Sequence, residues 1–139
     1  MSLPYLALVE ALVTITSCTF LRCEATFATS YGGAILFLGT SLVVQDSHFE
    51  ACTSSTSGGA INHGCYGQKF GSTTILNSRF VENESVLGGA VALLCDSTDR
   101  HLISSSYFSR NVAAFMPSTE SGGIGGDLYL NYGLVDVQG

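Results

Sequence analysis

The chain has 139 residues, of which 46% are apolar and 12% charged, and its formal net charge is −6. This length suits a single domain, and the apolar content excludes a disordered chain. The acidic balance argues against nucleic acid and against an anionic membrane surface as partners. No apolar run reaches the roughly 18 residues that a membrane-spanning helix needs, so we expect no membrane span in this segment.

Residues 3–13 have two interpretations. Leu, Ala and Glu favour helix, so the stretch could form an apolar helix that caps one end of the fold. Alternatively, the spacing of the later repeats aligns Leu3 and Pro4 with a Gly-Gly pair, and residues 5–8 with residues 34–37. We favour the second interpretation, in which a first coil begins in extended form.

A repeat of roughly 30 residues organises the chain from there on. Each copy opens on two adjacent glycines, which are followed by a short apolar run. Glycine supplies the backbone angles and the absent side chain that a sharp corner demands. The predicted structural corners are Gly32, Gly33, Gly58, Gly59, Gly88, Gly89, Gly125 and Gly126.

A phenylalanine with fixed neighbours ends each copy. A β-branched residue stands five positions before it, and Cys or Asn stands three positions after it. Because this spacing recurs in four copies, equivalent residues are expected to stack in ladders. The core ladders are Ile15, Val44, Ile75, Ile103 and Phe20, Phe49, Phe80, Phe108, and the turn ladder is Cys23, Cys52, Asn83, Asn111. Asn83 also begins a formal glycosylation sequon, and its place in an inward ladder predicts that it is unmodified.

These patterns predict an all-β fold, a single-stranded parallel β-helix with three short strands per coil. The apolar runs are too short for helices, and each strand would pair with its equivalent about 4.8 Å above and below. One segment spans residues 1–139, with four to five coils of roughly 26 to 37 residues at 3–31, 32–57, 58–87, 88–124 and a partial coil at 125–139. Because the last coil ends without a polar cap, we expect a piece of a longer protein whose open strand edges self-associate.

Four of the five cysteines stand at equivalent positions of successive repeats. Cys23 and Cys52 are equivalent positions on successive coils, and so are Cys65 and Cys95. Vertical neighbours about 4.8 Å apart lie inside the Cα range of a disulfide. In an extracellular chain both pairs could therefore be bridged, which would leave Cys18 as a buried thiol. In the alternative, all five cysteines are small apolar residues that fill tight corners.

Two copies carry insertions, at residues 62–72 and 95–100, which leave the same side of the predicted solenoid. Their candidate ligand-binding side chains are His63, Tyr66, Lys69, Asp96, Asp99 and Arg100. A zinc site at His63, Cys65 and Cys95 lacks the usual ligand spacing, and a calcium or acid–base site lacks carboxylates on neighbouring coils. We therefore favour solvated turns and expect no metal, no cofactor and no catalytic residue.

The pattern Gly-Gly-Ala-Ile/Val followed by Phe-x-x-Asn resembles the repeats of the chlamydial polymorphic outer membrane proteins. Residues 32–35, 58–61 and 88–91 carry the first motif, and residues 80–83 and 108–111 carry the second. Two further copies have Cys in place of Asn. Similar repeats occur in other large right-handed β-helix surface proteins, including protozoan ones. The resemblance covers essentially the whole chain, and it implies a right-handed, autotransporter-like passenger that is exposed at the cell surface or secreted and is used in adhesion.

The sequence thus favours a non-enzymatic structural or adhesive β-helix segment that presents a long, rigid, mildly acidic face. By the resemblance, its partner would be a surface protein or glycan of a host or neighbouring cell. The alternative is a fragment of a carbohydrate-active enzyme with a pectin-lyase-like fold, whose groove would use the insertion loops. The two differ in one respect, because an enzyme needs acidic or basic residues at matching heights on adjacent coils and an adhesin does not.

Overall fold

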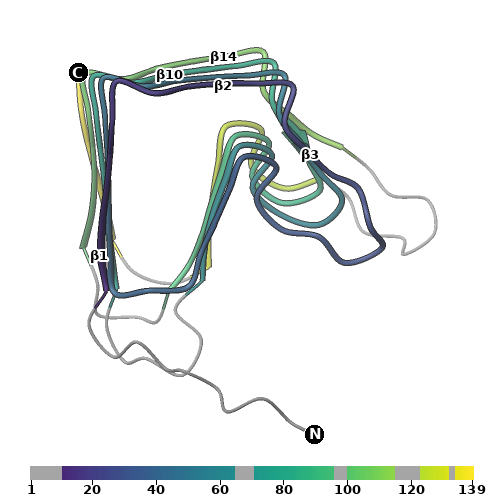
Figure 1. The fold of residues 1–139 in the computed structure, drawn as a ribbon, viewed down its shortest axis with the longest axis horizontal. Helices are drawn as coiled ribbons and strands as arrows, with labels where there is room; N and C mark the ends of the chain where they lie inside the picture. Colours follow the sequence, from purple (N-terminus) through teal and green to yellow (C-terminus); the bar gives the residue numbers. More distant parts are fainter. Residues whose placement is uncertain (1–10, 65–70, 96–99, 115–122, 132–133) are drawn as a thin grey trace, which may run out of the picture.

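The computed structural model of the chain describes residues 11–64, 71–95, 100–114, 123–131 and 134–139. In these residues the regular structure consists of β-strands alone, stacked as a parallel β-solenoid. Figure 1 looks along the stack, so that successive coils lie almost on top of one another. The described residues contain no helix that is long and apolar enough to cross a membrane.

The strands of the described residues form four parallel sheets, which we name A to D. Sheet A contains β1 (Leu12–Thr16), β5 (Ser41–Gln45), β9 (Ser72–Leu76), β13 (Arg100–Ser104) and β17 (Leu134–Gln138). Sheet B contains β2 (Thr19–Leu21), β6 (His48–Glu50), β10 (Arg79–Val81) and β14 (Tyr107–Ser109). Sheet C contains β3 (Glu24–Ala25), β7 (Thr53–Ser54), β11 (Glu84–Ser85) and β15 (Val112–Ala113). Sheet D contains β4 (Ile35–Phe37), β8 (Ile61–Gly64), β12 (Val91–Leu94) and β16 (Leu128–Leu130).

The predicted all-β parallel solenoid is confirmed. Sheets B, C and D stack four strands each, so three turns separate their first and last strands, and sheet A stacks a fifth strand. Each coil contributes four strands rather than the predicted three. The additional strands, those of sheet C, have only two residues each, which is too short for an alternating pattern to be visible in the sequence. The right-handed sense stays a prediction from the resemblance.

The first coil is extended from Leu12 onward. Residues 1–10, on which both interpretations of the N-terminal stretch depend, lie outside the described residues.

The two predicted core ladders are present. Ile15, Val44, Ile75 and Ile103 pair in register along sheet A. The four phenylalanine rings of sheet B stack with centroids 4.7–4.8 Å apart and planes within 8° of parallel. Phe49 and Phe80, in the middle of the stack, have no exposed surface. Aromatic contact of this kind adds about 0.5–1.5 kcal/mol per pair to the free energy of burial.

A ladder of small residues lines the corner between sheets A and B. The hydroxyl of Ser47 accepts a hydrogen bond from the Cys18 amide at 3.2 Å, and it donates to the Gln45 carbonyl at 2.8 Å. Ser78 and Ser106 repeat both bonds one and two coils further on. Each hydroxyl therefore accepts from the backbone amide of the equivalent residue in the preceding coil, so that this amide is not left without a hydrogen-bond partner.

The turn ladder links the coils through side-chain amides. Asn83 Oδ1 accepts from the Cys52 amide at 3.0 Å, and Asn83 Nδ2 donates to the Phe49 carbonyl at 3.2 Å. Asn111 makes the same two bonds to Asn83 and Phe80. Asn83 is fully buried, as its predicted place in an inward ladder requires.

The cysteines differ in part from the prediction. Cys18, Cys23 and Cys52 are free thiols, so the bridge considered between Cys23 and Cys52 is not formed in the structure. The Cys52 Sγ lies 3.7 Å from the Phe20 carbonyl oxygen, the position that an asparagine amide takes in the next two coils. The thiol therefore acts as a small buried donor in the ladder. Cys95 is disulfide-bonded, and its predicted partner, Cys65, lies outside the described residues.

The glycine pairs form the predicted corners for two distinct reasons. The first glycine is in the left-handed region, as at Gly58 with φ +66°. At the second, the backbones of neighbouring coils approach closely, and a Cβ on Gly59 would lie 2.0 Å from the Gly89 carbonyl oxygen. Two other corners also use left-handed residues, which the sequence did not reveal because none of them is glycine. The corner between sheets A and B uses Ser17, Asp46, Asn77 and Ser105, and the corner between sheets B and C uses Arg22, Ala51, Glu82 and Arg110.

Candidate functional site

Most of the ligand-binding residues predicted in the insertion loops lie outside the part of the chain that the structure describes. Tyr66, Lys69, Asp96 and Asp99 lie outside the described residues. The remaining two belong to different environments. His63, on β8, is fully buried, and Arg100, the first residue of β13, is exposed.

His63 is part of the core. Its Nδ1 lies 2.6 Å from the Thr73 hydroxyl and its Nε2 lies 2.8 Å from the Gly39 carbonyl oxygen. Its ring packs on Phe37 with centroids 4.8 Å apart. Because both ring nitrogens already contact core groups, His63 has no nitrogen to offer to zinc. Within the described part of the chain, no three His, Cys, Asp or Glu side chains gather as metal ligands do.

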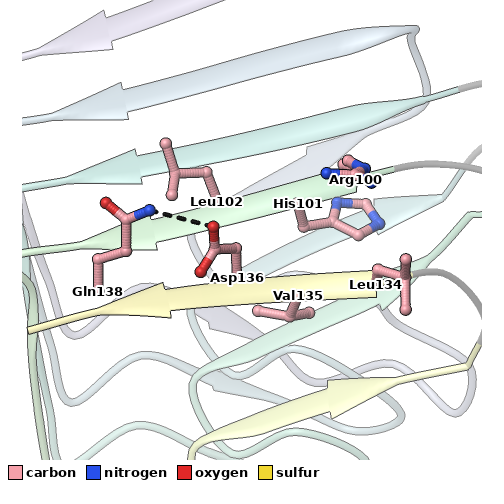
Figure 2. A pocket seen from close by; sticks show the side chains of 7 residues that line it. All are labelled: Arg100, His101, Leu102, Leu134, Val135, Asp136 and Gln138. Carbon is pink, nitrogen blue, oxygen red and sulfur yellow. Dashed lines mark hydrogen bonds between the residues drawn. The ribbon is translucent and has the colours of Figure 1, made fainter.

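A hollow of about 460 Å³ lies along β13 and β17 at one edge of sheet A (Figure 2). Its lining residues are Arg100, His101, Leu102, Leu134, Val135, Asp136 and Gln138. Asp136 is the single carboxylate among the described lining residues, and its Oδ2 accepts from Gln138 Nε2 at 3.0 Å. Glycoside hydrolysis commonly uses a pair of carboxyl groups, and the described lining residues, which can bind a polar ligand, do not by themselves supply that pair.

The outer face of sheet B carries a second group of polar side chains. Successive residues of a strand point to opposite faces, so the residues on either side of each buried phenylalanine point outward. Along the stack, pairing places Thr19, His48, Arg79 and Tyr107 in one outward column. The parallel column is Leu21, Glu50, Val81 and Ser109, of which Val81 is buried. Together these eight residues are the sheet B face.

The sheet B face holds its charged and aromatic groups in defined pairs. The Arg79 guanidinium carbon lies 4.7 Å from the centroid of the Tyr107 ring, which is a cation–π contact. His48 Nε2 lies 3.2 Å from Glu50 Oε2, which becomes an ion pair when the imidazole is protonated. Tyr107 is 52% exposed, so the outer side of this aromatic ring is available to a partner.

The corner between sheets B and C extends this face. Arg22, Ala51, Glu82 and Arg110 occupy equivalent left-handed positions there. Arg110 and Glu82 form an ion pair with an N–O distance of 2.7 Å. A hollow of about 330 Å³ between the first two coils is lined by Leu21, Arg22, Glu50 and Ala51. Three of the four arginines in the sequence therefore belong to the sheet B face and its corner.

Sequence reasoning did not identify these residues, although a signal for them exists. Phe49 and its equivalents were expected to point inward, and alternation along a strand then requires their neighbours to point outward. Charged residues are more concentrated in the insertions, which therefore gave the stronger signal in the sequence. The sheet B face offers guanidinium, imidazole, carboxylate and aromatic groups on rigid strands, a combination that can bind a sugar ring or a protein side chain.

Comparison of the chain with protein-family models, with curated proteins and with solved structures finds no match.

Proposed function

We propose that this chain is a non-enzymatic structural and adhesive segment of a cell-surface or secreted protein, and that the sheet B face is its binding face. The observation that carries the proposal is the column in which His48, Arg79 and Tyr107 occupy successive coils, with Arg79 stacked on the Tyr107 ring. Tyr and Arg dominate the energetics of protein interfaces because they combine large contact area with directional polar groups.

The described carboxylates around this face support binding rather than catalysis. Glu50 lies against His48, and Glu82 is paired with Arg110. Each carboxylate is thus occupied by a neighbouring side chain of this face, so both glutamates can position those side chains for a ligand.

The partner that we propose is a surface protein or glycan of a host or neighbouring cell, which also places the chain outside the cell. The partner and the location both follow from the resemblance to polymorphic outer membrane protein repeats. The chemistry of the face is compatible with them. An exposed tyrosine ring can stack on the apolar side of a sugar, and arginine can form paired hydrogen bonds with a carboxylate.

The test is a binding assay with the folded chain coupled to fluorescent beads, on cultured epithelial cells and on an array of immobilised glycans. We expect the double variant Arg79→Ala/Tyr107→Ala to reduce binding at least about tenfold, because two such anchors commonly contribute more than 1.4 kcal/mol. The matched control is Thr14→Ala/Thr74→Ala, which removes two side chains from the outer face of sheet A and should leave binding unchanged.

Two results would overturn the proposal. In the first, the chain binds no better than a heat-unfolded sample. In the second, the double variant binds as well as the unmodified chain. Turnover of polygalacturonate by the chain would instead favour the carbohydrate-active enzyme.

A further inference from the structure

Cys23 and Cys52 are vertical neighbours on the first two coils. The residues that flank them pair in register, Leu21 with Glu50 before the turn and Glu24 with Thr53 after it. The Thr53 amide donates to the Cys23 carbonyl at 2.8 Å, so the two backbones remain hydrogen-bonded at this point. Strands paired in this way lie about 4.8 Å apart, within the Cα separation of 4.4–6.8 Å that a disulfide spans.

The side chains of this ladder also touch from one coil to the next. In the equivalent positions two coils further on, Asn83 Nδ2 lies 2.9 Å from Asn111 Oδ1. Cys23 and Cys52 hold equivalent positions on the first two coils, and the Cys52 Sγ lies 3.7 Å from the carbonyl oxygen of Phe20 in the preceding coil. The Cys52 sulfur therefore reaches into the turn that holds Cys23.

We propose that Cys23 and Cys52 form a redox-sensitive modification site, at which a low-molecular-weight disulfide such as oxidised glutathione converts the two thiols into one disulfide between coils. The structure contains the reduced form of this pair. The product joins the first coil to the second through residues 29 positions apart in the sequence. The bond would add a covalent link between two coils that otherwise associate through backbone pairing and packing.

The reaction proceeds by two thiol–disulfide exchanges. The half-buried Cys23 thiol loses its proton to solvent and attacks one glutathione sulfur, and the other glutathione leaves as a thiolate that takes up a proton. Cys52 then loses its proton and attacks the Cys23 sulfur, which releases the second glutathione. In total two protein thiols are oxidised and one glutathione disulfide is reduced to two thiols. Burial raises the pKa of the Cys52 thiol to about 11, so the second exchange should accelerate as the pH rises.

Cys18 provides an internal control because it lies in a different ladder. Its backbone amide donates to the Ser47 hydroxyl, so the residue above it is a serine and not a cysteine. Its Sγ lies 3.3 Å from the carbonyl oxygen of Thr16, two residues before it in its own coil. Oxidation should therefore leave Cys18 as a thiol.

The test uses the folded chain, incubated with oxidised glutathione and analysed by intact mass and by digestion after glutamate. We expect Cys18→Ser to lose two hydrogens and to yield residues 11–24 in a reducible linkage to a species that contains residues 51–82. Because that peptide carries both Cys52 and Cys65, fragmentation of the linked species assigns the bond to Cys52. Cys52→Asn cannot form the bond. It introduces at this position the side-chain amide that Asn83 and Asn111 supply in the next two coils. It should gain one glutathione instead.

Denaturant shows whether the fold drives the reaction. In urea the bridge should form at least about tenfold more slowly, because the fold no longer holds the sulfurs together. The proposal fails if folded Cys18→Ser retains both thiols. It also fails if Cys52→Asn loses the same two hydrogens, or if bridging in urea is as fast as in buffer.

Discussion

The Cys52 amide donates to Asn83 Oδ1 across one turn of the solenoid, at 3.0 Å. The side-chain amide of the same asparagine donates to the carbonyl of Phe49, the phenylalanine of the preceding coil. One buried side chain thus satisfies both a donor and an acceptor of the neighbouring coil. This relationship explains why the turn after each phenylalanine carries Asn or Cys.

Replacing Asn83 should therefore be costly. Asn83→Ala leaves the Cys52 amide and the Phe49 carbonyl without their partner, and each buried unsatisfied group costs about 1–3 kcal/mol. We expect the free energy of unfolding to fall by roughly 2–4 kcal/mol in urea melts. Asn83→Cys, which copies the residue of the two preceding coils, should lose distinctly less. Equal losses in the two variants would mean that ladder hydrogen bonds contribute little.

The stacked phenylalanines predict a second large loss in the free energy of unfolding. Phe49→Ala removes the ring that lies between Phe20 and Phe80, and truncations of fully buried phenylalanine cost about 3–5 kcal/mol. Gln45→Ala, on the exposed face of the same coil, should change the stability by less than about 0.5 kcal/mol. Denaturant melts that ranked these variants in the opposite order would contradict the assignment of the inward face.

A left-handed alanine predicts a gain in stability. Ala51 has φ +54°, a conformation that costs an L-residue with a Cβ roughly 1–2 kcal/mol and that asparagine tolerates better. Ala51→Asn should raise the unfolding midpoint, and Ala51→Val should lower it because a β-branched side chain suits this region least. Calorimetry on the two variants checks the sign of each change. A higher midpoint for Ala51→Val would exclude backbone strain at this corner.

The Cys52 thiol predicts how stability depends on alkaline pH. Burial, the largest cause, raises its pKa from about 9 to about 11, so the folded state favours the protonated thiol. The resulting stabilisation is complete below pH 9 and is lost as the pH rises from about 9 to about 11. Unfolding midpoints of the reduced chain should fall across this window, and they should fall less in Cys52→Asn. Identical profiles would assign the alkaline loss to other groups.

The last described strand predicts self-association of this 139-residue chain. Val137 pairs with Ile103 and belongs to the inward ladder, yet it is 68% exposed whereas Ile103 is 4% exposed. An inward-pointing charge on an edge strand opposes pairing with another chain, so Val137→Lys should shift the chain toward monomer. Gln138→Lys adds the same charge on the outward side of the same strand and should leave association unchanged. Sedimentation velocity separates the two outcomes, and a chain that is monomeric without either substitution would contradict the prediction.

The sequence by itself determined the solenoid. In a stack of coils, equivalent positions have the same backbone conformation and the same packing neighbours. The same residue types therefore recur at a similar spacing, as Phe20, Phe49, Phe80 and Phe108 do. The glycine corners, both core ladders and the turn ladder could all be located in this way, because each depends on a residue type that few others can replace. The two corners whose left-handed residues differ from coil to coil could not. The two-residue strands of sheet C were missed because they are too short to show alternation.

Only the tertiary structure decided which polar residues belong to the core and which form a face. The sequence presents His63 as a candidate ligand, but the fold buries it between Thr73 and the Gly39 carbonyl. Arg79 and Tyr107 are 28 residues apart, and they contact each other only because successive coils pair in register. The physical reason is that the outward positions of a solenoid are not restricted by packing. Their residues vary from coil to coil, and the periodicity that reveals the core says nothing about them.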